Sequence, residues 1–187
     1  MSTGPQDEAR AVMGSLALMP AHEHPELVAE PVWVALAAAV VAPERVWVAA
    51  IDPELADTER LVEAYGVALD VSANCVVVAG RRGAETRWVA CSVLASSRAD
   101  VNGVVRRELD ARKASFAPVD ATLEATRMEY GGITPIGLPD GWPVLVDEAV
   151  AARPWVCIGS GIRGSKLVVP GASLGKLPHA RVLALTR

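Results

Sequence analysis

The sequence is poor in the residues that several functional classes need. Aromatic residues make up 4% of the 187 residues. The three cysteines, Cys75, Cys91 and Cys157, each lie in an apolar run without the paired spacing of a metal site. We therefore expect buried free thiols, no metal and no disulfide framework, which fits a reducing, cytoplasmic compartment.

A targeting signal and a long apolar segment are also lacking. The first ten residues are polar and acidic, unlike a signal peptide. The apolar run at 32–41 is too short to cross a bilayer, and Pro43 follows it. The net charge of −4 does not favour a protein that reads DNA grooves, but it leaves contact with an RNA end open. We expect no membrane or DNA partner.

The sequence does contain enough apolar residues for one packed domain, since 51% are hydrophobic and 21% are charged. Residues 1–24 are polar at their start, and His22 and His24 have no further metal ligands nearby, so we expect a flexible lead-in. Residues 25–187 are expected to form a single domain. Short strands separated by turns and mixed with helices predict an α+β fold around a curved mixed sheet.

Hydrophobic periodicity and turn residues place the individual elements. Asp57 and Gly66 are suited to begin and end a helix between them. The sequence Gly80-Arg81-Arg82-Gly83 is expected to be the turn of a hairpin. Helices are predicted at 32–41, 58–65, 100–109 and 118–126, and strands at 45–51, 75–79, 87–95, 144–146, 155–158, 166–169 and 181–185.

A first glycine cluster spans 130–137, Tyr-Gly-Gly-Ile-Thr-Pro-Ile-Gly. Paired glycines, Gly131 and Gly132, allow a ligand to approach the backbone, and Pro135 stiffens the loop after them. Such a loop can direct N–H groups at a carbonyl oxygen. A tight turn between a helix and a strand explains the same residues, and the pattern alone does not separate the two.

A second glycine cluster spans 159–166, Gly-Ser-Gly-Ile-Arg-Gly-Ser-Lys. It lacks the spacing of a phosphate-binding P-loop, and a strand rather than a helix is expected after it. A hairpin turn with a glycine-rich wall fits better.

Two other patterns contain residue types that are typical of catalytic groups. Asp147 and Glu148 follow a predicted buried strand, but adjacent strand residues face opposite ways, so they are not a natural acid/base pair. Asp147 therefore either points into a cleft or caps a helix. A Ser-His or Cys-His hydrolase has little support, because Gly-x-Ser-x-Gly is absent and His179 is the one histidine beyond the N-terminal segment.

The order of these segments, from about Leu61 to Leu185, resembles the YbaK/prolyl-tRNA-synthetase-associated family. The family's Gly-x-x-x-Pro motif matches Gly131 to Pro135, and its late glycine-rich segment resembles 159–164. The segments that carry the resemblance are 72–78, 90–95, 100–102, 112–117, 131–137, 146–148 and 159–164.

The resemblance implies a fold in which helices surround a curved, barrel-like sheet. It also implies an aminoacyl-tRNA deacylase, free-standing or fused to prolyl-tRNA synthetase, that removes a small wrong amino acid from tRNA. No metal or cofactor is implied. Such a second sieve is useful because a synthetase separates small side chains poorly. The implied partners are the aminoacylated 3′ end of tRNA and, as a further candidate, a synthetase, with a monomer or homodimer as the assembly. The implied catalytic residues are Asn74, Gly131, Gly132 and Asp147, and the implied substrate-binding residues are Pro135, Gly159, Ser160 and Gly161.

The sequence departs from the family at Asn74, where the family carries a lysine. Asparagine can hydrogen-bond but has no charge to offer an oxyanion. This substitution keeps open a non-catalytic module that binds an aminoacyl-tRNA, an amino acid or a nucleotide, and a small-molecule ester hydrolase is a weaker option. A second departure is Arg127, where the family often has glycine. Candidates for contact with the acceptor stem are Arg81, Arg82, Arg106, Arg107, Arg112 and Lys113.

Overall fold

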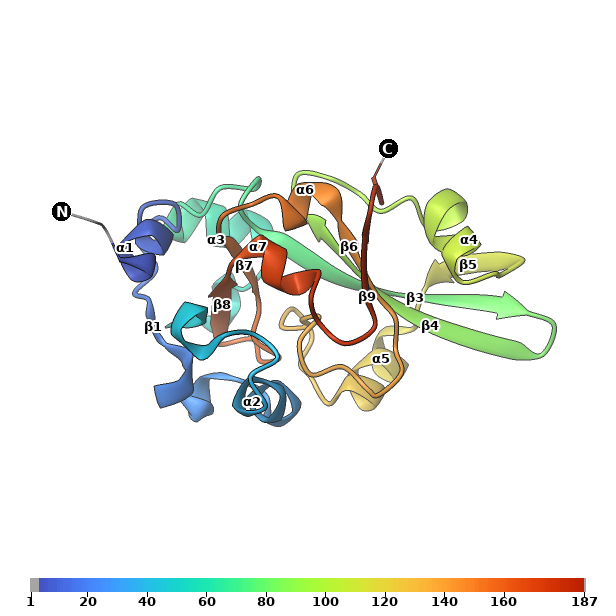
Figure 1. Ribbon diagram of the computed structural model, residues 1–187, viewed down its shortest axis with the longest axis horizontal. Helices are drawn as coiled ribbons and strands as arrows, with labels where there is room; N and C mark the ends of the chain where they lie inside the picture. The colour runs from blue at the N-terminus through green and yellow to red at the C-terminus, as the bar shows by residue number, and fades with distance from the viewer. Residues whose placement is uncertain (1–3, 187) are drawn as a thin grey trace.

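The computed structural model describes residues 4–186 and has an α+β architecture with two sheets (Figure 1). One sheet has the order β1-β2-β8-β7 and the other the order β5-β3-β4-β6-β9. Pairing among the described residues leaves both sheets open, so the barrel-like closure that the resemblance implies is not confirmed. The strands are β1 (Met19–Pro20), β2 (Trp47–Ala50), β3 (Ala73–Arg82), β4 (Glu85–Leu94), β5 (Lys113–Phe116), β6 (Val144–Asp147), β7 (Val156–Gly159), β8 (Ser165–Val169) and β9 (Ala180–Leu183).

Short helices surround the sheets, and none within residues 4–186 is long and apolar enough to cross a membrane. The α-helices are α1 (Pro5–Arg10), α2 (Glu30–Ala37), α3 (Thr58–Tyr65), α4 (Arg106–Glu108), α5 (Val119–Thr126), α6 (Glu148–Ala151) and α7 (Gly171–Leu174). Single 3₁₀ turns lie at Ala21–Glu23, Pro25–Leu27, Pro43–Arg45 and Pro53–Leu55, and one π-helical turn at Val101–Val105 precedes α4.

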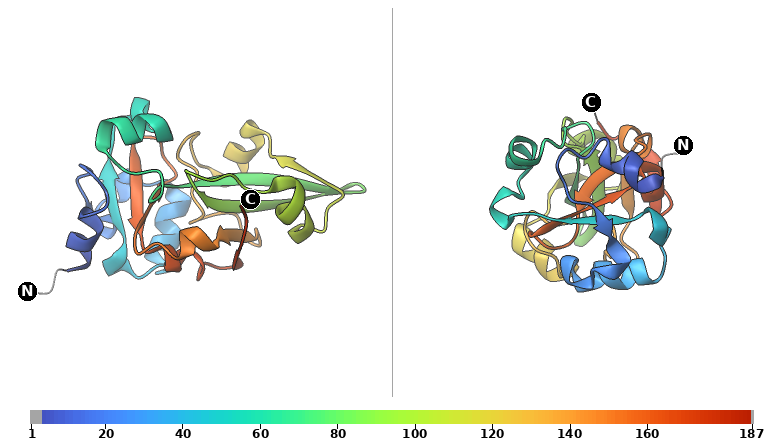
Figure 2. Two further views of the ribbon diagram at one scale, coloured as in Figure 1. Left: turned by 90° about the horizontal axis from the view of Figure 1, so that it is seen from above. Right: turned by 90° about the vertical axis from the view of Figure 1, so that its left-hand side faces the viewer.

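The β3–β4 hairpin is the longest feature and projects from the body as an arm (Figure 2). Its antiparallel register runs from Ala73 opposite Leu94 to Arg82 opposite Glu85. The turn therefore falls later than the four residues predicted for it, 80–83. Strand β5 pairs with β3 from Val78 to Arg81, which extends the strand beyond its apolar stretch. Tertiary pairing thus decided the length of the strand, which local turn residues alone did not predict.

The two sheets meet at the start of β3. Ser72 and Cys157 form an isolated parallel bridge, and the Cys157 N–H donates to the Val71 carbonyl at 2.7 Å. This junction places the first residues of β3 beside β7. Segments that are far apart in the chain are thereby brought into one place, where the candidate site lies.

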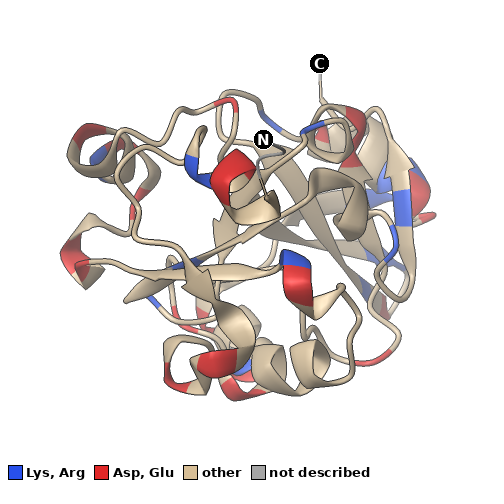
Figure 3. Cartoon of the chain, turned by 60° about the vertical axis from the view of Figure 1, so that its left-hand side comes forward, with Lys and Arg blue, Asp and Glu red and all other residues tan. Residues whose placement is uncertain are grey.

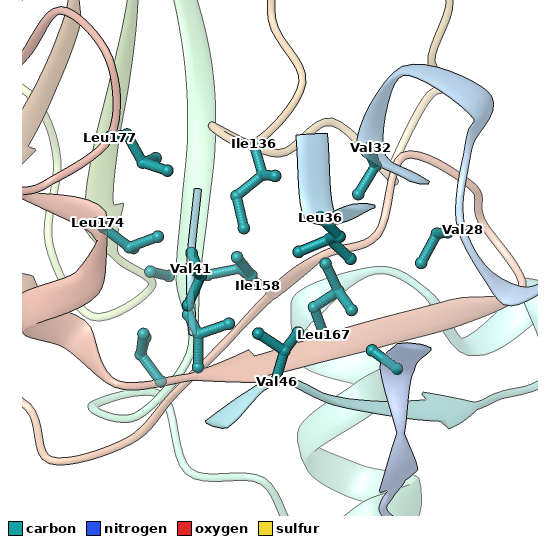
Figure 4. Packing of buried hydrophobic residues seen from close by; sticks show 14 of the residues in the cluster. Val28, Val32, Leu36, Val41, Val46, Ile136, Ile158, Leu167, Leu174 and Leu177 are labelled. Carbon is teal, nitrogen blue, oxygen red and sulfur yellow. The ribbon is translucent and has the colours of Figure 1, made fainter. Parts of the chain in front are cut away.

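The main hydrophobic core fills the space between α2 and the four-stranded sheet (Figure 4). Val32 and Leu36 of α2 point into it, Ile158 and Leu167 rise from β7 and β8, and Ile136 enters from the glycine–proline loop. Ile136 is fully buried, so this side chain anchors the loop that follows Gly131 and Gly132.

The segment expected to be a flexible lead-in contributes buried side chains where the structure describes it, from residue 4 onward. Met13 and Leu18 pack with Trp47 of β2 in a second cluster, and β1 pairs with β2. These residues are therefore part of the packed domain. Their apolar positions follow the polar start of the chain, which alone suggested a lead-in.

Most predicted elements are confirmed with shifted ends. Helix α3 lies between Asp57 and a left-handed Gly66, as the capping residues predicted. Helix α2 ends at Ala37 rather than residue 41, in a turn where Ala39 has a φ of 54°. The predicted helix at 100–109 begins as the π-helical turn, with Asp100 accepting from the N–H groups of Gly103 and Val104.

Truncating Met13 tests whether the N-terminal segment is part of the core. Met13 is fully buried, so Met13→Ala should lower the free energy of unfolding by about 2–5 kcal/mol. Val12 is 43% exposed and serves as the matched control, since Val12→Ala should change stability by about 0.5 kcal/mol or less. Urea unfolding measures both, and equal stability of the two variants would contradict the packing of this segment.

Candidate functional site

A pocket of about 290 Å³ opens at the junction of the two sheets. The walls come from the turn before α3, the start of β3, the glycine–proline loop, β7 and one side chain of β8. The lining residues include Asp57, Thr58, Ser72, Asn74, Cys75, Tyr130, Gly131, Ile133, Cys157, Gly159 and Lys166. Asn74, Gly131 and Gly159, three of the residues that the sequence selected, therefore share one cavity.

The two glycine clusters lie against each other and form one wall. The Gly161 N–H donates to the Gly132 carbonyl at 2.7 Å, and the Glu129 N–H donates to the Gly161 carbonyl at 2.8 Å. A Cβ at Gly159 would lie 2.3 Å from the Gly132 carbonyl oxygen, closer than any side chain tolerates. The absence of side chains is therefore what lets these two backbones touch.

Gly131 offers a free backbone donor at the pocket. Its φ of 81° is in the left-handed region that favours glycine. Its N–H has no hydrogen-bond partner among residues 4–186, whereas the Gly132 N–H donates to the Glu129 carbonyl at 3.0 Å. Of the two expected oxyanion donors, Gly131 is thus available in this conformation and Gly132 is engaged within the loop.

Polar side chains lie at the start of β3. The Asn74 side chain is exposed to the pocket mouth, and its Oδ1 accepts from Thr58 Oγ1 at 3.2 Å. Ser72 is 5% exposed, and its Oγ has no hydrogen-bond partner in the described part of the chain. A buried hydroxyl without a partner beside a cavity is suited to hold a water or a polar substrate group.

Lys166 is the functional candidate that the sequence did not reveal. Lys166 lies within the apolar strand β8, and nothing in the sequence around it, apart from its own charge, indicated a role in the site. Lys166 is 7% exposed, and its Nζ donates to the carbonyls of Ala56 at 3.0 Å and Gly131 at 3.3 Å. Burial, which disfavours the charged form, lowers the pKa of this ammonium below its ordinary value.

An ion pair closes the rim of the pocket. Arg163, from the second glycine cluster, binds Asp57 with an Nη2–Oδ2 distance of 3.1 Å. The Arg163 backbone N–H also donates to Glu129 Oε2 at 2.6 Å. The ion pair joins the turn before α3 to the late glycine cluster, so it fixes two walls of the pocket relative to each other.

Two of the three free cysteines line the pocket, Cys75 and Cys157. Burial raises the pKa of both thiols, that of Cys157 to about 11. Thiols with raised pKa values are protonated at neutral pH and are poor nucleophiles. The cavity therefore favours attack by water over a cysteine mechanism.

The remaining predicted site residues lie elsewhere. Asp147 is 3% exposed, and its carboxylate accepts from the N–H groups of Ala149 and Leu185 at 3.0 and 2.8 Å. Asp147 caps the N-terminus of α6, so of the two predicted alternatives, a cleft or a helix cap, the structure has the helix cap. Ser160 and Gly161 support the glycine wall from behind, since Ser160 Oγ donates to the Ile162 and Ser165 carbonyls. Pro135 lines a different cavity.

That second cavity, of about 580 Å³, lies between α2, the end of α5 and residues 135–144. It is larger, but apart from Pro135 it shares none of the predicted site residues. No group of three or more histidine, cysteine or acidic side chains within residues 4–186 is arranged to hold a metal. The smaller pocket, which gathers Asn74, Gly131 and Gly159, is therefore the candidate site.

Residues 52–177 match the family model of the aminoacyl-tRNA editing domain. This stretch covers more than half of the chain and contains the whole pocket. The chain belongs to this family. The match begins before Leu61, where the resemblance in the sequence started, and it takes in the turn that supplies Asp57 and Thr58.

Solved structures share the fold at low identity. A candidate trans-editing enzyme for prolyl-tRNA synthetase has 20% identity and a TM-score of 0.71, covering 91% of this chain and 99% of that one. The hypothetical protein APE2540 has 19% identity and a TM-score of 0.72, covering 84% and 100%. A structure from work on epitope grafting onto scaffold proteins has 21% identity and a TM-score of 0.71, covering 85% and 97%. The comparison with curated proteins gives no match.

Removal of the Asp147 carboxylate tests whether it serves the fold or the pocket. Asp147→Ala loses two hydrogen bonds to a buried carboxylate and should lower the free energy of unfolding by about 2–4 kcal/mol. Asp147→Asn keeps an acceptor oxygen and should lose less. If the editing domain deacylates tRNA, its rate per folded molecule should stay within about twofold of the unchanged protein. Loss of activity in a variant shown to be folded would instead assign Asp147 to the chemistry.

Proposed function

We propose that this protein is a trans-acting deacylase that hydrolyses the ester of a tRNA mischarged with a small amino acid. The observation that carries the proposal is the pocket at the sheet junction, which Ser72, Asn74 and Gly131 line together, with the Ser72 hydroxyl and the Gly131 N–H unpartnered within residues 4–186. The family supplies the substrate class. The proposed setting is the cytoplasm, beside a synthetase such as prolyl-tRNA synthetase.

The proposed reaction needs a donor for the ester carbonyl and a place for water. The Gly131 N–H is suited to the carbonyl oxygen, since backbone donors at a developing oxyanion accelerate acyl transfer. Ser72 Oγ is suited to hold the attacking water. Pro135, Ser160 and Gly161 act by holding the glycine wall in place.

Selection of a small amino acid follows from the walls. A cavity of about 290 Å³ that must also admit the end of a tRNA leaves little room for a side chain. Gly131 and Gly159 line it without side chains, and Cys157 and Ile133 are fixed by the core. Bulky aminoacyl groups are rejected by collision with these walls, so that only groups small enough to enter the pocket are hydrolysed.

A second candidate function is a non-catalytic module that binds an aminoacyl group. Asn74 favours it, since a neutral amide paired with Thr58 replaces the family's lysine. A module of this kind would bind a mischarged tRNA and protect its ester, whereas the deacylase would shorten the lifetime of that ester. One time course therefore separates the two.

The basic residues near the end of the hairpin arm suit the acceptor stem. Residues 81–113 hold eight arginines or lysines and four acidic residues, in a chain of net charge −4. Blue segments gather toward the right-hand side of Figure 3, whereas red segments are spread over the helices. Several of these arginines are engaged, since Arg82 pairs with Asp110 and Arg87 with Glu85.

Arg81 and Lys113 are different because they have no acidic partner in the described residues. They are exposed and directly opposite each other in the β3–β5 register. Like charges in this position repel unless a polyanion lies over them. Arg81 lies seven residue steps along β3 from Asn74, roughly 23 Å at a strand's rise per residue. The arm thus places cations well beyond the ester, where the stem continues from the single-stranded end.

A panel of mischarged tRNAs tests the reaction, with Ser72→Ala and Ser92→Ala as a matched pair. Both serines are buried with an unpartnered Oγ, but Ser92 lies in β4 outside the pocket. We expect deacylation of tRNAs carrying small amino acids, about tenfold slower in Ser72→Ala and unchanged in Ser92→Ala. Protection of the ester from spontaneous hydrolysis would favour the binding module instead.

Neutralising the unpaired cations tests the docking of the stem. Arg81→Gln with Lys113→Gln should raise KM for mischarged tRNA about tenfold and reduce the salt dependence of binding by about two phosphate contacts. A short aminoacylated CCA fragment, which lacks the stem, should be hydrolysed at the unchanged rate. Lys176→Gln, which also removes an exposed charge, is the control. An equal loss on the fragment would show that these residues act on the pocket rather than on the stem.

A further inference from the structure

Lys166 is buried in a protein that uses little lysine. The chain has three lysines, and the other two, Lys113 and Lys176, are exposed. Lysine is almost never buried without a partner, because the ammonium loses its hydration. A buried lysine in β8 therefore needs an explanation in terms of what its charge meets.

No carboxylate of the described residues pairs directly with Lys166, and the nearby charges of Asp57 and Arg163 act on its ammonium in opposite directions. Its two hydrogen bonds go to backbone carbonyls, those of Ala56 and Gly131. The carboxylate of Asp57 lies at the same pocket but is held by Arg163. An ammonium has three N–H donors, so one remains for the cavity that Lys166 lines.

The strand neighbours of Lys166 leave the side chain free to reach this cavity. In the sheet register Lys166 lies opposite Ala49 on one side and Gly159 on the other. Side chains at opposite positions share a face of the sheet, and here both neighbours are small. Gly159 adds no side chain to this face, and the loop carbonyls of Gly132 and Ile133 pack against it, so the Lys166 side chain lies directly beneath the glycine loop that lines the pocket.

We propose that Lys166 is the cationic group of this pocket that stabilises the oxyanion of the substrate ester, entering from β8 rather than from β3. The inference rests on the proposed deacylase function and names the charged residue that serves it. Asn74, which carries no charge, then acts as a hydrogen-bonding group at the mouth of the pocket.

In the proposed step, water attacks the ester carbonyl carbon and a C–O bond forms. The carbonyl π electrons move to the oxygen, which becomes an oxyanion that receives hydrogen bonds from the Lys166 ammonium and the Gly131 N–H. As the intermediate collapses, the bond to the ribose oxygen breaks, and a proton of the attacking water ends on that oxygen. Lys166 keeps its proton throughout, and the products are the free amino acid and the tRNA.

The experiment moves the charge between strands. Lys166→Gln should lower kcat for a short aminoacylated CCA fragment by about 100- to 1,000-fold, as loss of one oxyanion donor does. Adding Asn74→Lys to Lys166→Gln returns a lysine to the same cavity from β3 and should recover at least tenfold of that loss. Lys176→Gln, an exposed lysine outside the pocket, should leave kcat unchanged. Lys166→Met keeps an apolar stem without the charge and replaces Lys166→Gln if the latter does not fold.

The pH dependence separates a chemical role from a structural one. The reaction needs protonated Lys166, so kcat falls as the pH rises through the pKa of this residue, which burial holds below the ordinary 10.5. In the double variant Asn74→Lys/Lys166→Gln the new lysine lies at an exposed position, so its pKa is ordinary and the alkaline loss should move to higher pH. Titration of the substrate amine is common to both proteins and cancels in the comparison.

Each result decides a different question. An unchanged protein that hydrolyses no mischarged tRNA overturns the proposed function. An active protein with an equally active Lys166→Gln variant overturns only the role of Lys166. A third result is a folded Lys166→Gln or Lys166→Met variant that is inactive, is not rescued by Asn74→Lys, and shows no shift in the pH at which kcat falls. This result would assign Lys166 a structural role, in which it bridges the Ala56 and Gly131 carbonyls.

Discussion

The site depends on the direct contact between two stretches of glycine-rich backbone. The Gly161 N–H binds the Gly132 carbonyl at 2.7 Å, and Gly159 packs where any Cβ would collide with that same carbonyl oxygen. Because this contact leaves no room for side chains, the loop at 130–137 is held against β7 and Gly131 is held at the cavity. Ile136 secures the other end of the loop in the core.

Charge is arranged around this contact in two layers. Arg163 and Asp57 form the outer layer, where a partly exposed ion pair contributes little stability but restricts the orientation of the walls. Lys166 forms the inner layer; its hydrogen bonds go to backbone carbonyls, and the charges of Asp57 and Arg163 act on it in opposite directions. Its desolvation costs stability, and the same desolvation strengthens its interaction with any negative charge that develops in the pocket. The buried charge lowers the stability of the fold, and because it is already desolvated it stabilises the transition state more strongly.

The sequence predicted the parts of this arrangement that local chemistry controls. The sequence indicated the close backbone contacts at Gly131, Gly132 and Gly159, because few residues other than glycine permit them. It also indicated the ends of α3, because few residues suit the ends of a helix. Lys166 could not be predicted in this way, since a strand pattern treats a lysine as an outward residue, and only the three-dimensional position of the Ala56 and Gly131 carbonyls shows what its ammonium contacts. Asp147 was ambiguous for a related reason: a carboxylate after a buried strand is equally suited to a cleft or to a helix cap.

The departures from the family then acquire a common physical explanation. Arg127 adopts a left-handed φ of 54° at the end of α5, the conformation for which glycine is favoured, which explains why a glycine suits this position. Asn74 keeps a place in the pocket, while the positive charge comes from β8. A charge buried beneath the glycine loop acts at short range on the ester, whereas an exposed lysine at position 74 would also attract phosphates outside the pocket. In the proposed deacylase, moving the charge inward separates recognition of the tRNA, which we assign to the hairpin arm, from stabilisation of the reacting carbonyl.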